Sequence, residues 1–185
     1  MKAEKMKINN PKCLIAYFSR KGNNYVNGTI VNLPVGNTEV VAKMIQKMTR
    51  GDLFHIEAVN AYPEDYTETT GVAQQELRTH ARPKLTSHLE NMSSYDVIFL
   101  GHPNWWGTMP MPVFTFLEEY DLSGKTIASF CTHEGSGLGR SVTDIKKICP
   151  KSTIREGLAI RGGEAKNAQD TVSGWLREIG MTGEK

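Results

Sequence analysis

Two adjacent tryptophans stand in a segment that favours irregular backbone. The run Tyr95–Gly101 is typical of a buried strand, and His-Pro-Asn-Trp-Trp-Gly-Thr-Met-Pro-Met-Pro follows it directly over residues 102–112. Prolines and a glycine around the tryptophans disfavour a helix or a strand. Trp105 and Trp106 therefore cannot both enter one core, and we expect at least one indole to meet a flat aromatic ligand. An aromatic lid over the sheet edge is the alternative.

A second candidate loop is rich in glycine and runs into a helical pattern. It covers residues 132–141, with the sequence Thr-His-Glu-Gly-Ser-Gly-Leu-Gly-Arg-Ser. Ser136 is a poor candidate for a hydrolase nucleophile, because Glu134 and Leu138 replace the glycines that flank the serine of a nucleophile elbow. His133 has no neighbours at metal-ligand spacing, so the sequence argues against a metal site.

A third candidate site is the segment around the first expected helix start. Residues 19–23 follow the first strand pattern, and Gly-Asn-Thr-Glu at 36–39 opens the helix. Free amides and the positive end of the helix dipole attract a phosphate, and the hydroxyls of Ser19 and Thr38 could add donors. Ordinary capping by Asn37 or Thr38 is the other interpretation. The nearby aromatic loop favours the phosphate.

Strand patterns alternate with helical patterns along the chain. The strand patterns cover residues 13–18, 53–57, 96–101, 126–131 and 153–159. The helical patterns cover residues 38–49, 66–80, 113–120, 138–148 and 165–179. This alternation predicts an α/β protein built as a three-layer α/β/α sandwich. Since the carboxyl ends of parallel strands share one edge, the loops after the first, third and fourth strands should converge on one site.

One insertion interrupts this plan. Residues 23–35 contain two short β-prone pieces around Asn27-Gly28, a strong hairpin signal. The hairpin could cover a ligand or build a subunit contact in a homodimer. We expect residues 1–12 to be a disordered or extended lead-in, and residues 13–185 to form a single domain.

The composition is that of an ordinary globular protein. Hydrophobic residues make up 39% and charged residues 23%, and we expect no membrane span. The net charge of +2 comes from interspersed acids and bases, which gives little support to nucleic-acid binding. Cys13, Cys131 and Cys149 form no Cys-x-x-Cys pair and are expected to be buried. The absence of a signal-peptide pattern favours a cytoplasmic location.

On these residues the chain resembles the flavodoxin-like FMN proteins. The similarity extends from Cys13 to Met181. It rests on Tyr-Phe-Ser at 17–19 with Gly-Asn-Thr at 36–38, on Pro-Asn-Trp-Trp-Gly at 103–107, and on Thr-His-Glu-Gly-Ser-Gly at 132–137. The resemblance implies a five-stranded parallel sheet of order 2-1-3-4-5. It is strongest to a branch marked by the string Asn-Trp-Trp-Gly-Thr-Met-Pro.

The same resemblance implies FMN as the cofactor and assigns its contacts. The phosphate would be bound by Ser19, Arg20, Gly36, Asn37 and Thr38. Ring stacking and main-chain bonds would come from Pro103, Asn104, Trp105, Trp106 and Gly107. The other edge of the ring would be lined by Thr132, His133, Glu134, Gly135, Ser136 and Gly137. Within this loop we expect His133 to stabilise reduced FMN.

Several functions remain open. The first is an FMN-binding, flavodoxin-type redox protein that carries electrons to or from a redox partner protein. The second is an NAD(P)H-dependent quinone or FMN reductase. A phosphate-receiving signalling domain ranks far lower, since it needs acidic residues where this chain has Ser-Arg-Lys at 19–21. Tyr62 and Tyr66 could close over a ligand, but packing of the second helix is the preferred interpretation.

Overall fold

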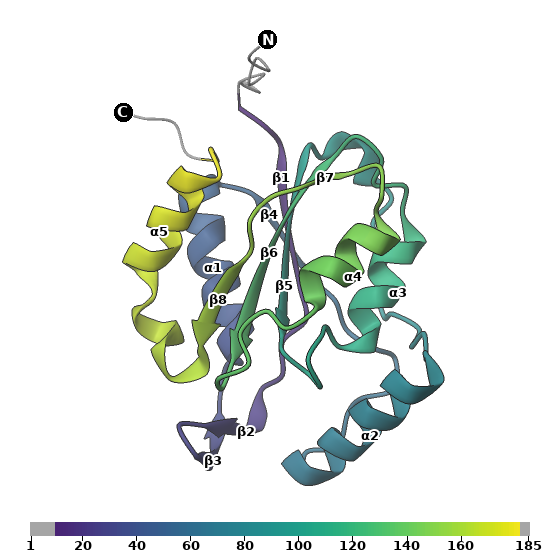
Figure 1. The fold of residues 1–185 in the computed structure, drawn as a ribbon, viewed down its shortest axis with the longest axis vertical. Coiled ribbons are helices and arrows are strands. Elements are labelled where there is room, and N and C mark those ends of the chain that lie inside the picture. The colour runs from purple at the N-terminus through teal and green to yellow at the C-terminus, as the bar shows by residue number, and fades with distance from the viewer. Residues whose placement is uncertain (1–9, 182–185) are drawn as a thin grey trace.

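The computed structural model describes residues 10–181, in which a parallel sheet lies between two layers of helices (Figure 1). The strands run in the order β4-β1-β5-β6, and β7 and β8 both pair with β6. They are β1 (Cys13–Tyr17), β4 (Asp52–His55), β5 (Val97–Pro103), β6 (Thr126–His133), β7 (Thr153–Ile154) and β8 (Leu158–Arg161). All these pairings are parallel. The predicted α/β sandwich of order 2-1-3-4-5 is confirmed.

The fifth strand is not the single run that its sequence pattern predicts. It divides into β7 and β8, which are separated by residues 155–157. At this break the indole nitrogen of Trp175 donates a hydrogen bond to the Glu156 carbonyl at 2.9 Å. A β-carbon on Gly157 would lie 3.0 Å from the Ser129 hydroxyl, so a side chain there would fit tightly against β6.

Helices cover both faces of the sheet. On one face lie α1 (Asn37–Thr49) and α5 (Gln169–Glu178), and on the other lie α3 (Met111–Glu119) and α4 (Ser141–Ile148) (Figure 1). Helix α2 (Tyr66–Thr79) extends beyond the carboxyl edge of the sheet. Two short 3₁₀ helices complete the set, η1 (Met92–Ser94) and η2 (Gly162–Asn167).

Several predicted helix boundaries were wrong. Helix α3 begins two residues earlier than predicted, after Pro110, because proline is well suited to a helix start. Helix α4 begins at Ser141 and not at residue 138, since the glycine-rich loop takes up the preceding residues. The predicted last helix divides into η2 and α5 at Ala168.

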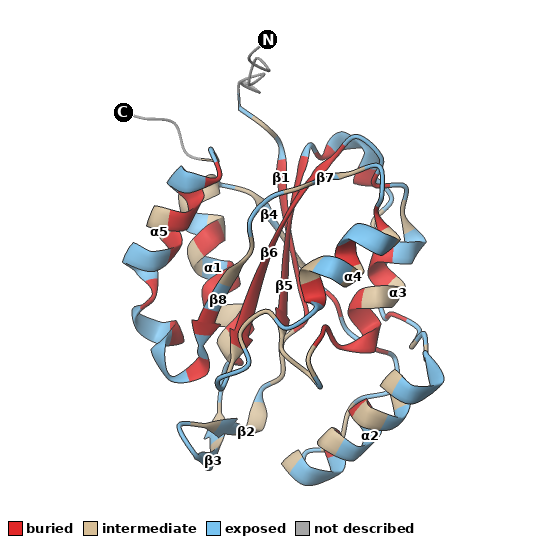
Figure 2. Ribbon diagram, viewed as in Figure 1, coloured by how far each residue is buried: buried red, intermediate tan, exposed pale blue. Residues whose placement is uncertain are grey.

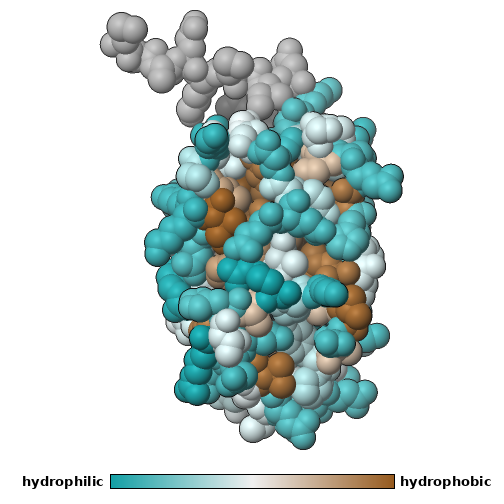
Figure 3. Space-filling model, turned by 90° about the vertical axis from the view of Figure 1, so that its right-hand side faces the viewer, coloured by the Kyte–Doolittle hydropathy of each residue, from teal (hydrophilic) through white to brown (hydrophobic). Residues whose placement is uncertain are grey.

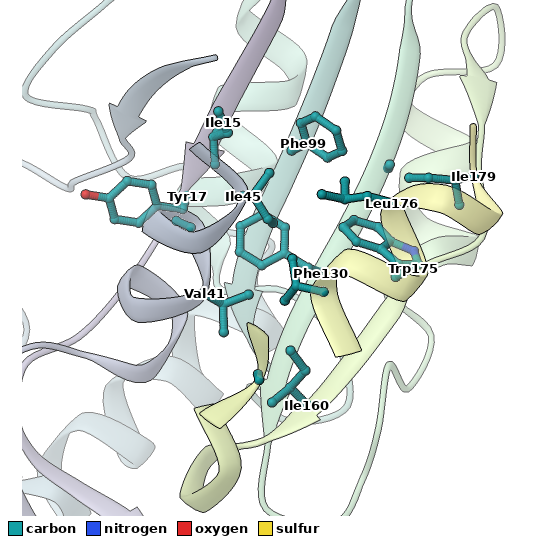
Figure 4. Packing of buried hydrophobic residues seen from close by; sticks show 14 of the residues in the cluster. Ile15, Tyr17, Val41, Ile45, Phe99, Phe130, Ile160, Trp175, Leu176 and Ile179 are labelled. Atoms are coloured by element: carbon teal, nitrogen blue, oxygen red, sulfur yellow. The ribbon is translucent and has the colours of Figure 1, made fainter. Parts of the chain in front are cut away.

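Alternation along the strands divides the core into two clusters. Ile15, Phe99 and Phe130 face α1 and α5, where they pack with Val41 and Trp175 (Figure 4). Their neighbours along each strand face α3 and α4, as period-two side-chain alternation requires. Figure 2 shows buried residues along the central strands, whereas α2 is mostly half-buried or exposed. Trp175 is thus a packing residue, as predicted.

The inserted hairpin forms as predicted, but separately from the main sheet. Strands β2 (Gly22–Val26) and β3 (Thr29–Leu33) pair antiparallel in a two-stranded sheet. Asn27 and Gly28 form the turn with φ angles of 51° and 88°, the left-handed values that such tight hairpins need. The hairpin lies at the carboxyl edge of the main sheet, near α2 (Figure 1).

The three cysteines are free and buried, as predicted. Within residues 10–181 no helix has the length and apolar character needed to cross a membrane. Figure 3 shows a mainly hydrophilic face with separate hydrophobic patches, on the side that carries α2, α3 and α4. Most of the predicted N-terminal lead-in, residues 1–9, lies outside the described residues.

Candidate functional site

A cleft of about 450 Å³ opens at the carboxyl edge of the sheet, where the three candidate loops meet. This volume lies within the range of pockets that bind small molecules. Twelve of the predicted site residues line it: Ser19, Arg20, Asn37, Thr38, Asn104, Trp105, Trp106, Gly107, Thr132, His133, Glu134 and Ser136. Gly36, Pro103, Gly135 and Gly137 support the loops without lining the cleft.

At one end of the cleft, helix α1 presents free amide groups. Its N-cap residue is Gly36, and no cap comes from Asn37 or Thr38, so the capping interpretation was wrong. The Ser19 hydroxyl instead accepts a hydrogen bond from the Glu39 amide at 3.1 Å. The amides of Asn37 and Thr38 bond to no other described residue. An anion at this helix start would satisfy them.

Gly36 is required at this helix start by close packing. A β-carbon there would lie 2.2 Å from the Ser19 hydroxyl and 2.7 Å from the Arg20 carbonyl oxygen. Both distances are shorter than real contacts allow. Gly36 therefore lets the loop after β1 lie directly against the start of α1, which brings Ser19 next to the free amides.

Two buried threonines form the floor of this end. The hydroxyl oxygens of Thr38 and Thr132 lie 2.7 Å apart, and both side chains are almost fully buried. Two hydroxyls carry two hydrogens, and the bond between them uses one. The remaining hydrogen can be donated into the cleft, which both residues line. A ligand oxygen at this point would satisfy it.

Arg20 has a structural role beside the cleft. Its guanidinium donates to the carbonyl oxygens of Pro63 and Glu64 at 2.8 and 2.7 Å, and also to that of Asn23. Burial lowers the pKa of this guanidinium from its usual value. Arg20 thus joins the loop after β1 to the segment before α2, and its positive charge remains at the cleft wall.

The two tryptophans point to different environments. Trp106 and Gly107 form a tight turn with φ angles of 55° and 84°, which is closed by hydrogen bonds between Trp105 and Thr108. The Trp105 ring packs edge-on against Phe18, with ring centroids 5.1 Å apart. The Trp106 side chain is 48% exposed. The prediction that both indoles cannot enter one core is confirmed.

Trp106 is held in place although it is exposed. Its indole nitrogen donates a hydrogen bond of 3.0 Å to the carbonyl oxygen of Thr70 in α2. This bond crosses from the tryptophan loop to a helix that lines the same cleft. The indole therefore has a defined position at the cleft mouth, where its face can contact a ligand.

The tryptophan loop and the glycine-rich loop form one connected unit. The Asn104 side chain accepts from the Gly107 amide at 3.0 Å and donates to the Gly137 carbonyl at 2.8 Å. The Arg140 amide donates to the Gly107 carbonyl at 2.8 Å. Gly139 has a φ of 54°, and a β-carbon on it would lie 2.2 Å from the Gly107 oxygen. The two loops can approach this closely only with glycine at position 139.

His133 is neutral and presents a donor. Its Nδ1 accepts a hydrogen bond from the Gly135 amide at 2.9 Å, so the ring proton of the neutral form is on Nε2. Burial, together with the nearby positive charge of Arg161, lowers the pKa of His133 below its ordinary value. The half-buried imidazole lines the cleft as a neutral N–H donor.

Some residues of the cleft have no motif in the sequence. Tyr25 comes from the hairpin, and Tyr66, Thr69, Thr70 and Ala73 come from α2. Asn24 and Gly162 complete this set. The four α2 residues have the spacing i, i+3, i+4 and i+7, which places them on one side of a helix. Tyr66 thus lines the cleft, contrary to the preferred packing interpretation, whereas Tyr62 packs against Phe18 and Trp105.

The family model described as Flavodoxin matches residues 12–179. The chain belongs to the flavodoxin family. A protein from Bacteroides eggerthii that is assigned as a flavoprotein has 30% identity and a TM-score of 0.74, over 91% of this chain and 98% of the other. None of the curated protein sequences compared gives a significant match.

Two more solved structures share the fold of this flavodoxin-family chain. A protein from Bacteroides uniformis, also assigned as a flavoprotein, has 25% identity and a TM-score of 0.69, over 90% of this chain and 98% of the other. A flavoprotein from Lactobacillus acidophilus, solved in complex with FMN, has 19% identity and a TM-score of 0.63, over 88% of this chain and 99% of the other. Membership of the flavodoxin family supports a flavin as the ligand of the cleft.

Proposed function

We propose that this protein binds FMN in the cleft and acts as a flavodoxin-type redox protein that carries electrons through the flavin. The observation that carries the proposal is that one cleft has both polar hydrogen-bond donors and an exposed aromatic face in its lining. One end holds the free amides of α1 and a spare buried hydroxyl, and the other holds the exposed indole of Trp106. The FMN complex of the Lactobacillus acidophilus flavoprotein supports FMN as the flavin.

The residues at the first end suit a phosphate. The amides of Asn37 and Thr38 would bind it, and the Thr38–Thr132 hydroxyl pair would donate one more hydrogen bond. The α1 dipole and the Arg20 charge act in the same direction, because both stabilise a dianion. Ser19 is already bonded to the Glu39 amide, and its hydroxyl hydrogen stays available for donation.

The residues at the other end suit a flat ring. Trp106 offers an indole face at the cleft mouth, and the Gly107 backbone leaves room for close approach. His133 lines the cleft, and its neutral form carries the ring proton on Nε2. When bound, the flavin supplies reversible electron transfer, and the protein's contribution is to bind it, orient it and fix the electrostatics around it. A neutral donor beside the ring favours the reduced form, which is richer in electrons.

The alternative is an NAD(P)H-dependent quinone or FMN reductase. One experiment separates the two functions. The purified protein is soaked with FMN, desalted and examined by visible absorbance, and NADH or NADPH is then added under argon. Retained flavin bands that neither nucleotide bleaches would support the carrier fed by a redox partner protein. Rapid bleaching would support the reductase, and the loss of all flavin on desalting would contradict both.

We also propose a cytoplasmic location, a homodimer, and membership of the branch with the Asn-Trp-Trp-Gly-Thr-Met-Pro string. Tyr25 and Ile30 on the hairpin are 42% and 51% exposed, which leaves apolar surface for a subunit contact. Sedimentation of the FMN-loaded protein at several concentrations would test the dimer.

A further inference from the structure

The β2–β3 hairpin depends on contacts outside itself for its position. It is a two-stranded sheet, and among residues 10–181 no strand pairing joins it to the main sheet. An isolated hairpin of this kind is marginally stable in water. Its side chains are half-buried or exposed, so it has no core of its own. The residues that hold it therefore decide where it lies.

The base of the hairpin is firmly anchored. The Asn24 side chain donates to the carbonyl oxygens of Arg20 and Gly22 at 2.9 and 3.1 Å. The Arg20 guanidinium in turn binds the carbonyl oxygens of Pro63 and Glu64. Several hydrogen bonds thus fix the start of the hairpin to the loop after β1 and to the segment before α2.

The tip of the hairpin is held by fewer contacts. The Asn27 amide donates a hydrogen bond of 2.9 Å to the carboxylate of Glu134, in the glycine-rich loop. The Asn27 side chain also lies against Gly163 at the start of η2. A β-carbon on Gly163 would come within 2.4 Å of the side-chain nitrogen Nδ2 of Asn27. The tip therefore rests on the side of the cleft that is formed by the ends of β6 and β8.

The flank of the hairpin touches the opposite side of the cleft. Tyr25 stacks on Tyr66 of α2, with ring centroids 6.0 Å apart and planes inclined by 27°. Both tyrosines line the cleft. The hairpin therefore spans the cleft from α2 to the glycine-rich loop, with one hydrogen bond at its tip and one aromatic pair on its flank.

We propose that the β2–β3 hairpin is a strap over the cofactor site, which Glu134 and Tyr66 hold closed and which must open for FMN to enter or leave. The inference rests on the proposed function and sharpens it. A strap of this kind makes FMN a retained cofactor, which separates the protein from reductases that take up FMN as a substrate and release it in reduced form. Because the base is anchored and the tip is held by one hydrogen bond, the tip is the end that moves.

The geometry allows the strap to be locked chemically. A β-carbon on Gly163 would lie 2.8 Å from Asn27 Cγ, which is one bond away from the Asn27 β-carbon. Disulfides need β-carbons about 3.5–4.5 Å apart. The double variant Asn27→Cys with Gly163→Cys is therefore expected to form a disulfide across the closed strap. The three native cysteines are buried and will compete little.

The first experiment compares the oxidised and reduced double variant. We expect disulfide formation by thiol counting, and FMN association in stopped flow at least tenfold slower in the oxidised protein. Dithiothreitol should restore the rate, and each single cysteine variant should bind FMN at the same rate with and without the reductant. No disulfide, or equal association rates in the two states, would overturn the strap.

A second pair of variants tests the latch without a new covalent bond. Glu134→Ala removes the acceptor of the Asn27 amide, whereas Glu134→Gln keeps an acceptor oxygen. We expect the alanine variant to raise both the association and the dissociation rate of FMN about threefold or more, and the glutamine variant to raise them less, because it keeps the acceptor. If the alanine variant released FMN faster but bound it at an unchanged rate, Glu134 would only contact bound FMN, and the strap would be overturned.

The two proposals fail in different ways. Wild-type protein that binds no FMN would overturn the proposed function, and the gating of FMN with it. The disulfide yield of the double variant would still report whether the tip rests on Gly163, because that measurement needs no flavin. Wild-type protein that binds FMN, with a locked form that binds it equally fast, would overturn the strap alone.

Discussion

The hydroxyl oxygens of Thr38 and Thr132 lie 2.7 Å apart, although 94 positions separate the two residues in the chain. Thr38 stands in the first turn of α1 and Thr132 near the end of β6. Their contact joins the start of α1 to the strand that leads into the glycine-rich loop. The pair keeps one hydroxyl hydrogen for a ligand.

Thr38→Val should weaken the binding of FMN by about 0.5–1.5 kcal/mol, the net value of one hydrogen bond. Riboflavin, which lacks the phosphate, should lose much less. Fluorescence titration of both flavins with each protein measures the difference. The matched variant Thr132→Val should have a similar effect, and the double variant should lose less than the sum, because the two residues act as one unit. Equal losses for FMN and riboflavin would contradict the phosphate assignment.

Trp106→Ala should weaken FMN binding by about 1–3 kcal/mol, if base-on-aromatic stacking is taken as the guide. Trp106→Phe keeps an aromatic face and should lose less, although it also loses the hydrogen bond to the Thr70 carbonyl. The dissociation constant is measured by quenching of flavin fluorescence. An affinity of Trp106→Ala equal to that of the wild type would mean that the indole is only a lid.

His133→Ala should lower the two-electron potential of bound FMN. The neutral Nε2–H donor favours the reduced flavin, and a lost hydrogen bond of about 0.5–1.5 kcal/mol corresponds to about 10–30 mV. His133→Gln keeps an N–H donor and should retain part of the wild-type value. Equilibration with a reference dye under argon measures the potential. An unchanged or raised potential in the alanine variant would contradict this role.

Much of the fold follows from local sequence patterns. The apolar strands and the helical stripes each occupy one short stretch, and Asn27-Gly28 has the residue types that a tight turn needs. The break between β7 and β8 could not be predicted in this way. It depends on Trp175 and Ser129, which reach residues 156 and 157 only in the folded chain.

The residues of the cleft also fall into a group that the sequence predicted and a group that it did not. The loop motifs predicted the residues after β1, β5 and β6, because each motif sits at the end of a recognisable strand. Tyr25 and Tyr66 carry no motif and meet only when the hairpin and α2 lie side by side. Gly101 carries no local signal for its role either: it makes room for Phe130 from the neighbouring strand, and a β-carbon there would lie 2.2 Å from the ring.

His102 gives the fold a dependence on pH. Its side chain is fully buried in β5, where Nδ1 lies 3.0 Å from the Pro103 carbonyl oxygen and Nε2 bonds to no other residue of the described chain. Burial lowers the pKa of His102 from 6.5 to about 4. His102 is therefore neutral in the folded protein, whereas the same residue in the unfolded chain takes up a proton more readily.

The sign of this effect is fixed by the lowered pKa. The contribution of His102 is fully present above pH 6.5 and is lost as the pH falls toward 4, at about 1.4 kcal/mol for each pH unit. The total is about 3 kcal/mol of unfolding free energy. His102→Asn keeps a donor for the Pro103 carbonyl and does not titrate. Urea unfolding at pH 7, 6, 5 and 4.5 should show a smaller loss of stability in this variant, and parallel curves for the two proteins would contradict the assignment.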